Sequence, residues 1–205
     1  MKVIVQNYEK FNYVVIDDFF EQNDFNEITK VELENLENEE IKVYDKFNKE
    51  LKDRIYFKHN EQLISILGKL APKKIKLKRR FDIRLAQTGP DATYPVHQDH
   101  PNKILSVVVY ISPSVSTGTL LHSSEMDEKP KEIQWKSNRA FIFSRHPNNT
   151  WHSYVGDKKT FRRTIVYNIY TDDIFWHELI DKGYFGFVVD KLKQLKNRFK
   201  IKYGA

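Results

Sequence analysis

The sequence has no cysteine among its 205 residues. This absence excludes a disulfide framework, a thiolate nucleophile and any zinc or iron–sulfur site built on cysteine. A metal site in this chain must therefore draw its ligands from histidine, aspartate and glutamate side chains.

Long apolar runs are also missing. No stretch approaches the roughly 18 to 20 residues that a membrane span requires, and residues 1–13 lack the continuous apolar segment of a signal peptide. We therefore expect a soluble, cytoplasmic protein that has no membrane partner.

Linker composition is absent as well, because no Pro/Gly/Ser-rich or single-sign stretch divides the chain. A chain of this length can bury a sizeable core in one unit. We expect a single domain over residues 1–205, with a β core at about residues 78–171 and supporting helices within residues 20–70 and 174–203.

Charge of one sign is not concentrated on one long segment. The formal net charge is +6, but the Glu-rich residues 32–40 interrupt the lysines. Much of the basic excess lies in residues 73–80 and 191–202, where a solvated face is an adequate explanation. Charge therefore makes no strong case for a nucleic-acid partner, and nothing in the sequence indicates an oligomeric state.

Apolar spacing predicts three helical regions. Residues 23–38 and residues 49–70 both carry apolar side chains at helical spacing, and an Ala-Pro pair should end the second helix. Residues 174–203 have helical composition, with Gly183 and Gly186 as the expected interruptions.

Strands are expected before the first helix and throughout the middle of the chain. Residues 13–16 form a β-branched run, and further short β-branched and aromatic runs recur up to residue 170 with turn residues between them. This pattern is typical of a β-sandwich or barrel. The expected strands of the middle region are residues 80–86, 104–112, 119–122, 132–136, 140–144 and 163–170.

The most informative segment surrounds His97 and Asp99. Side chains i and i+2 of an extended chain point the same way, so these two residues can approach one metal ion while Gln98 faces elsewhere. Such a triplet is a weak signal alone, because a surface hydrogen-bonding pair has the same spacing. Downstream partners must therefore support it.

His152 is the expected third ligand, on a later strand. Two histidines and one carboxylate leave positions open at a metal ion, which suits iron(II), whereas a structural zinc site would need a fourth protein ligand. His100 and His146 compete for this role but rank lower, since His100 breaks the alternation with His97 and His146 is followed by proline.

Arg162 and Thr164 share one face of the last expected strand. An arginine that points into a barrel is costly unless it meets an anion, and a carboxylate matches its planar guanidinium. Arg163 is the alternative anchor, because a β-bulge would exchange the two faces.

These residues together resemble a known family. The order His-x-Asp, a long gap, His, and then Arg-x-Thr about ten residues later is similar to the prolyl 4-hydroxylase-like branch of the iron(II)/2-oxoglutarate dioxygenases. The resemblance covers roughly residues 13–170. Supporting pattern lies in residues 15–19, 118–120 and 138–143.

The resemblance implies a mainly β fold, a double-stranded β-helix (jelly roll, cupin-like), with helices from both ends of the chain packed on one face. It implies iron(II), 2-oxoglutarate and dioxygen as cofactors, and hydroxylation of an unactivated C–H bond in a prolyl or other peptidyl residue or a small amino-acid-like metabolite. No catalytic residues beyond the metal ligands are expected. The implied site residues are His97, Asp99 and His152 for the metal, Arg162, Thr164 and Tyr110 for 2-oxoglutarate, and Tyr94 and Gln87 for the substrate pocket.

Some features leave alternatives open. Gln87 stands where relatives often have an aromatic residue, and Tyr110 could serve only in the core. The nucleic-acid demethylase branch has a second arginine where this chain has Asn168, which counts against DNA or RNA as substrate. A cupin-type metalloprotein that does not use 2-oxoglutarate would have no need of an inward Arg162. A non-enzymatic jelly-roll binding module would tolerate loss of the metal ligands His97 and Asp99.

Overall fold

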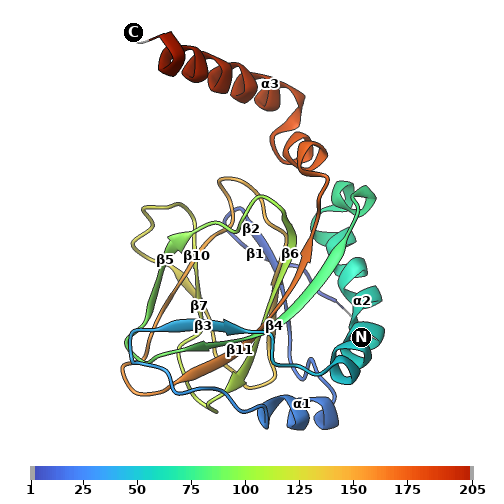
Figure 1. Ribbon diagram of the computed structural model, residues 1–205, viewed down its shortest axis with the longest axis vertical. Helices are drawn as coiled ribbons and strands as arrows, with labels where there is room; N and C mark the ends of the chain where they lie inside the picture. Colours follow the sequence, from blue (N-terminus) through green and yellow to red (C-terminus); the bar gives the residue numbers. More distant parts are fainter. Residues whose placement is uncertain (1–2, 204–205) are drawn as a thin grey trace.

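The computed structural model describes residues 3–203, with side chains up to residue 193. Two β-sheets form the body, α1 and α2 lie on one side of it, and the end of α3 extends away from it (Figure 1). The elements are β1 (Gln6–Tyr8), β2 (Phe11–Ile16), α1 (Gln22–Thr29), β3 (Ile41–Tyr44), α2 (Lys49–Leu70), the 3-10 helix η1 (Pro72–Lys76), β4 (Arg80–Thr88), β5 (Thr93–His97), β6 (Lys103–Ser112), β7 (Thr119–His122), β8 (Lys131–Ile133), β9 (Ala140–Phe143), β10 (Trp151–Val155), β11 (Arg162–Tyr170) and α3 (Ile174–Tyr203).

The strands pair antiparallel in two sheets. The larger sheet has seven strands in the order β1-β2-β9-β6-β11-β4-β3, and the smaller has four in the order β5-β10-β7-β8. One face of the larger sheet packs against α1 and α2, and an aromatic cluster that includes Phe11, Tyr13, Phe141 and Phe143 packs on the other. This two-sheet arrangement is the predicted β-rich architecture.

Side chains along β4 and β11 alternate between two environments, the apolar core and the cavity. On β11, Ile165 and Tyr167 face the helices and belong to the main apolar core, while Arg162 and Thr164 face the space between the sheets. The period of two expected for a sheet buried on both faces is therefore present. This alternation places charged and polar side chains in the space between the sheets, while the apolar core on the other face stays buried.

Helix α2 has the predicted bounds. Its N-terminus is capped by Asn48, whose side chain accepts a hydrogen bond from the backbone N–H of Leu51. Its apolar face packs Ile55, Leu63 and Ile66 into the core beneath the larger sheet. The helix thus supports the strands that carry the cavity.

The first helix is shorter than predicted. A helix over residues 23–38 was expected, but α1 ends at Thr29. Beyond it, the partly buried Val31 and Leu33 alternate with exposed glutamates, and this period of two suits an extended chain. Tertiary contacts to the core therefore outweigh the helical spacing of the same residues.

Four strands are additional to those predicted: β1, β3, β5 and β10. Each is short, and β1, β3 and β5 are sheet-edge strands. Short edge strands carry little periodic signal, which explains why β1 and β3 were not expected. For β5 and β10, extended chain was expected at His97 and a strand at His152, but without bounds. Strand β8 also ends at Ile133, earlier than the predicted residue 136.

Helix α3 is interrupted where the sequence predicts. Gly183 has φ 69°, a left-handed conformation that glycine adopts at little cost, whereas Gly186 lies within the helix. The part before Gly183 contacts η1, and the part after it leads away from the sheets (Figure 1). Within residues 3–203, none of the helices combines the length and the apolar character that crossing a membrane requires.

Candidate functional site

A cavity of about 600 Å³ lies between the two sheets. This size falls within the range of small-molecule sites in proteins. Strands β4, β6, β10 and β11 supply most of its lining, and β3, β5, β7 and β9 contribute the rest together with Asp99. Six of the residues predicted from the sequence line it: Tyr94, His97, Asp99, His152, Arg162 and Thr164.

His97, Asp99 and His152 come together on one side of this cavity. His97 ends β5, Asp99 follows in the next loop, and His152 lies on β10 directly opposite His97 in the strand register. One potential ligand atom from each residue lies within 4.8 Å of the others. The strand pairing therefore brings together two histidines that are far apart in the sequence.

Backbone carbonyls orient both histidine rings. His97 Nδ1 lies 2.9 Å from the Pro95 carbonyl, and His152 Nδ1 lies 3.0 Å from the Thr150 carbonyl. A carbonyl only accepts hydrogen bonds, so Nδ1 of each ring carries a proton and Nε2 is the nitrogen left to bind a metal ion. Burial also lowers the pKa of His152 to about 4, which keeps this ring neutral.

Asp99 is held as a buried carboxylate. Lys103 Nζ lies 2.7 Å from Asp99 Oδ1, and the Ser106 hydroxyl donates a hydrogen bond to Oδ2. Burial alone would raise the pKa of Asp99, but the charge of Lys103 and these hydrogen bonds lower it to about 2. The cluster thus combines an ionised aspartate with a neutral histidine, the protonation states that a metal ion requires.

Arg162 lies in an aromatic box within the same cavity. Its guanidinium carbon is 3.9 Å from the centre of the Tyr154 ring, 5.3 Å from that of Tyr110 and 5.2 Å from that of Trp135. Among the described residues, no carboxylate lies within ion-pair distance of it, and its Nε has no hydrogen-bond partner. Burial lowers the pKa of Arg162. This cation is positioned to receive an anion.

Arg163 occupies the other face of β11. Its guanidinium donates a hydrogen bond of 3.3 Å to the carbonyl of Val31, on the side of the helices. The pairing of β11 with β6 does shift between Arg163 and Thr164, where Ile111 of β6 has no partner, but the register of β11 with β4 is continuous through both residues. The irregularity therefore lies on β6, and the exchange of faces considered for Arg163 does not occur. Of the two arginines, Arg162 is the one that faces the cavity.

Two further predicted residues, Tyr110 and Gln87, do not line the cavity directly. Tyr110 is buried in the aromatic box, where its hydroxyl accepts a hydrogen bond of 3.0 Å from the Thr119 backbone N–H. The prediction that Gln87 lines the substrate pocket is wrong. Gln87 pairs with Arg163 in the strand register and lies on the helix-facing side of β4, away from the cavity. Strand alternation explains this placement, because Ala86 and Thr88 take the cavity-facing positions.

The competing histidines remain outside the cluster. His100 is exposed and lies 2.7 Å from Asn102 Oδ1 through its Nδ1. His146 Nδ1 lies 2.8 Å from the carbonyl of Pro147. Within residues 3–193, His97, Asp99 and His152 are the group of potential metal ligands that the fold assembles.

Three residues of the site were not predicted from the sequence. Tyr154 lies two positions after His152, so strand alternation could have placed it in the cavity. Lys103 and Ser106 contact Asp99 only because the chain turns back after Asp99 to begin β6. Their contact depends on the path of a loop, and a loop has no periodic signal in the sequence.

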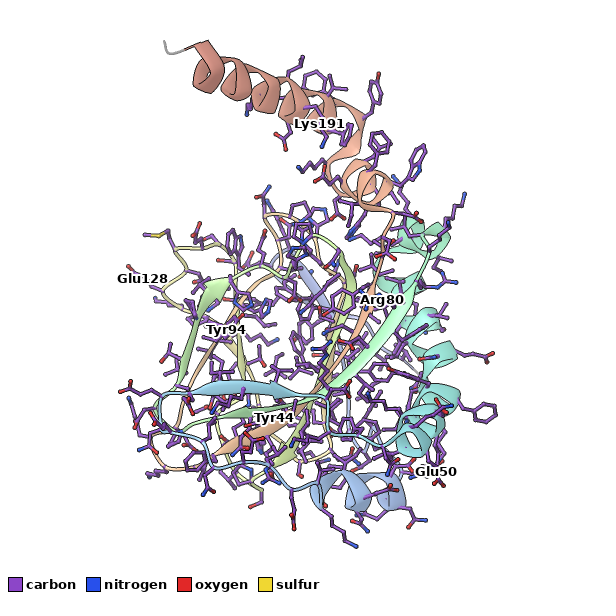
Figure 2. The ribbon with its side chains drawn as sticks, viewed as in Figure 1. Tyr44, Glu50, Arg80, Tyr94, Glu128 and Lys191 are labelled. Atoms are coloured by element: carbon purple, nitrogen blue, oxygen red, sulfur yellow. The ribbon has the colours of Figure 1, made fainter. Side chains whose placement is uncertain are left out.

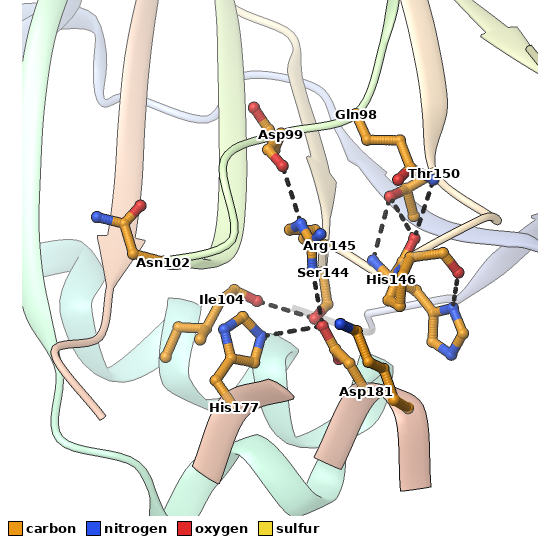
Figure 3. A network of polar contacts seen from close by, with 12 residues as sticks. Gln98, Asp99, Asn102, Ile104, Ser144, Arg145, His146, Thr150, His177 and Asp181 are labelled. Atoms are coloured by element: carbon orange, nitrogen blue, oxygen red, sulfur yellow. Dashed lines mark hydrogen bonds and ion pairs between the residues drawn. The ribbon is translucent and has the colours of Figure 1, made fainter. Parts of the chain in front are cut away.

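A second group of buried charges connects α3 to the loop that carries Asp99. Arg145 Nε donates a 2.8 Å hydrogen bond to the backbone carbonyl of Asp99, and its Nη1 lies 2.9 Å from Asp181 Oδ2 (Figure 3). Lys74 Nζ lies 2.6 Å from Asp181 Oδ1, and His177 Nε2 lies 3.4 Å from Oδ2. Asp181 therefore neutralises two cations beside this loop.

Replacing Asp181 with asparagine is expected to lower the free energy of unfolding by about 3 to 5 kcal/mol, because Lys74 and Arg145 would lose their common counter-charge. Urea unfolding of the two proteins measures this difference. Asp190→Asn is the matched control, since the Asp190 side chain is 41% exposed, pairs with Lys182 among the described residues and should change stability by about 0.5 kcal/mol or less. Equal effects of the two substitutions would contradict a buried structural role for Asp181.

No known protein family matches the sequence, and no curated protein matches it either. Solved structures do share its fold. The viral collagen prolyl hydroxylase of Paramecium Bursaria Chlorella virus-1, in complex with 2-oxoglutarate, is 16% identical with a TM-score of 0.54, over 78% of this chain and 95% of that one. A prolyl-4-hydroxylase of Pseudomonas putida is 15% identical with a TM-score of 0.57, over 78% and 93%.

The similarity extends to an enzyme with a different activity. The non-heme alpha-ketoglutarate-dependent epimerase SnoN from nogalamycin biosynthesis is 11% identical with a TM-score of 0.55, over 80% of each chain. At such identities, the likeness concerns the fold. This chain therefore has the jelly-roll fold of the 2-oxoglutarate- and iron(II)-dependent oxygenases, as the sequence predicted.

Proposed function

We propose that this chain is an iron(II)- and 2-oxoglutarate-dependent dioxygenase that hydroxylates an unactivated C–H bond. The single observation that carries the proposal is one cavity that holds two features: the His97, Asp99 and His152 cluster, and the buried Arg162, which has no counter-anion among the residues the structure describes. A metal cluster alone would fit many metalloproteins. The unpaired Arg162 adds a specific need for an anionic co-substrate.

The residues fit the implied metal. Two neutral imidazole nitrogens and one carboxylate form the donor set that non-haem iron(II) enzymes use with open positions for other ligands. The backbone carbonyls of Pro95 and Thr150 fix the two rings with Nε2 available. Bound iron(II) would supply the activation of dioxygen that couples oxidative decarboxylation of 2-oxoglutarate to hydroxylation.

The residues also fit the co-substrate. We assign Arg162 to the far carboxylate of 2-oxoglutarate, with Thr164 beside it on the same face of β11. The aromatic rings around Arg162 exclude water and hold its guanidinium in place, so an arriving carboxylate would meet an oriented, desolvated donor. Tyr110 supports this arrangement through its ring, since its hydroxyl is engaged with Thr119.

The substrate proposed here is a prolyl or other peptidyl residue, or a small amino-acid-like metabolite. Two of the similar structures are prolyl hydroxylases, which supports the first of these. Tyr94 lies at the edge of the cavity with 45% of its surface exposed, and its ring is 4.4 Å from that of His97. It is suited to contact a substrate that approaches the metal ligands.

The reaction is tested by measuring succinate formation from 2-oxoglutarate in the presence of iron(II) and oxygen. The proposal predicts slow succinate formation that requires both iron(II) and 2-oxoglutarate, even without a primary substrate. Metal-dependent activity that is indifferent to 2-oxoglutarate would favour the cupin-type alternative. Binding of a partner molecule without any metal requirement would favour a binding module.

A further inference from the structure

The cavity wall farthest from the smaller sheet is formed by three neighbouring strands, β6, β11 and β4. In their register, Tyr170 of β11 pairs with Lys103 of β6 on one side and with Arg80 of β4 on the other. The three side chains therefore form one row across the sheet. Neighbouring strands lie about 4.8 Å apart, so Arg80 begins about 10 Å from the strand that carries Lys103.

This row leads from the cavity opening to the proposed metal ligands. Lys103 Nζ contacts Asp99 Oδ1 at 2.7 Å, and the Arg80 guanidinium carbon lies 5.0 Å from the centre of the Tyr170 ring. Arg80 and Tyr94 lie on opposite sides of the body in Figure 2, on β4 and β5. A molecule that extends from the metal ligands toward β4 would meet Arg80.

Arg80 has no counter-charge of its own. In the described part of the chain, no carboxylate lies within ion-pair distance of its guanidinium, which rests on the Tyr170 ring instead. Arg84, four residues after Arg80 on the same face of β4, pairs with Asp82 at 3.0 Å. Two exposed arginines thus face the cavity with one carboxylate between them.

The cavity as a whole has more positive than negative side chains. Arg80, Arg84, Lys103 and Arg162 line it as cations, against Asp82 and Asp99 as anions. Iron(II) would add two positive charges and the 2-oxoglutarate dianion would remove two. The positive excess is therefore still present after both have bound, and it attracts a further anion.

We propose that the primary substrate carries an anionic group, a carboxylate or a phosphate, which Arg80 binds at the opening of the cavity with a contribution from Arg84. This inference rests on the proposed function and names the class of its substrate. The anionic group lies at the β4 end of the row, and the carbon to be hydroxylated lies near the cluster at the other end. Arg80 is a binding residue in this assignment and takes no part in the chemistry.

The experiment compares pools of probes in the succinate assay. Random hexapeptide pools of acidic, neutral or basic net charge form three arms, and pools of free dicarboxylic acids and of phosphorylated small metabolites form two more. The proposal predicts stimulation of succinate formation by at least one anionic pool and none by the basic pool. Stimulation led by the neutral or basic pool, or none by any anionic pool, would overturn it.

Variants then locate the anion. Arg80→Gln combined with Arg84→Gln should raise the KM for the stimulating pool at least about tenfold, and raising the salt to about 0.5 M should have a similar effect on the unmodified protein. Arg79→Gln is the matched control, because Arg79 is exposed and its guanidinium bonds to the Ile75 carbonyl. If the double variant behaves like Arg79→Gln, the assignment to Arg80 and Arg84 is wrong.

Failure of the proposed function gives a different result. Succinate formation without any pool reports on iron(II) and 2-oxoglutarate alone, and it should be absent in His97→Ala. If the unmodified protein shows none, the oxygenase assignment fails. If it shows this background activity while the pools do not differ by charge, only the substrate class fails.

Discussion

Replacement of His152 with alanine is expected to weaken iron(II) binding by at least about a hundredfold and to abolish succinate formation. The substitution removes one of three ligands, and a ligand bond of this kind contributes roughly 3 kcal/mol or more to metal affinity. Because His152 is buried and neutral, its removal leaves no unpaired charge behind, so the variant should still fold. Calorimetric titration with manganese(II), a stable substitute for iron(II), measures the affinity.

The matched control for this prediction is His100→Ala. His100 lies close to Asp99 in the sequence but is exposed and bonds to Asn102. Its removal should leave the metal affinity within about twofold of the unmodified protein. Tight metal binding by His152→Ala, or loss of binding in His100→Ala, would show that the metal lies elsewhere.

Replacement of Arg162 with methionine is expected to change two properties in opposite directions. Without ligands, the variant should be more stable by about 1 to 3 kcal/mol, because a desolvated cation without a counter-anion is exchanged for an apolar side chain of similar length. Its affinity for 2-oxoglutarate should fall at least about a hundredfold, since the charge-assisted pair is lost. Thermal unfolding with and without 2-oxoglutarate measures both effects.

Arg163→Met separates the two arginines. Arg163 lies on the opposite face of β11 and donates to the Val31 carbonyl, so this control should leave the affinity for 2-oxoglutarate unchanged. Metal binding should persist in both variants, as neither arginine contacts the His97, Asp99 and His152 cluster. Loss of co-substrate binding in Arg163→Met alone would reverse the assignment.

The sequence was informative where local periodicity and packing agree. Helix α2 has the predicted bounds because its apolar face, its Asn48 cap and the following proline all favour the same conformation. The alternation on β11 likewise separates Arg162 from Arg163 as predicted. His97 and His152 meet because their strands pair, and the order of motifs along the chain was sufficient to select them.

Other features depend on contacts that periodicity does not encode. Helix α1 ends at Thr29 because Val31 and Leu33 pack against the core from an extended segment. Gln87 is turned from the cavity by the register of β4, which a single-residue shift would reverse.

The support of Asp99 could not be predicted either. Lys103 reaches it because the chain turns back before β6, and Arg145 reaches its carbonyl from the end of β9. Asp181 joins this group from α3, far along the sequence. These partners come from separate loops and a helix, so their meeting is a property of the tertiary fold.

Anomalous X-ray diffraction from crystals grown with manganese(II) and 2-oxoglutarate tests the central assignment most directly. The expected result is one manganese peak bonded to His97 Nε2, an Asp99 carboxylate oxygen and His152 Nε2, with the free carboxylate of 2-oxoglutarate paired with Arg162. A peak bonded to other residues, or a 2-oxoglutarate molecule that leaves Arg162 unpaired, would contradict the account.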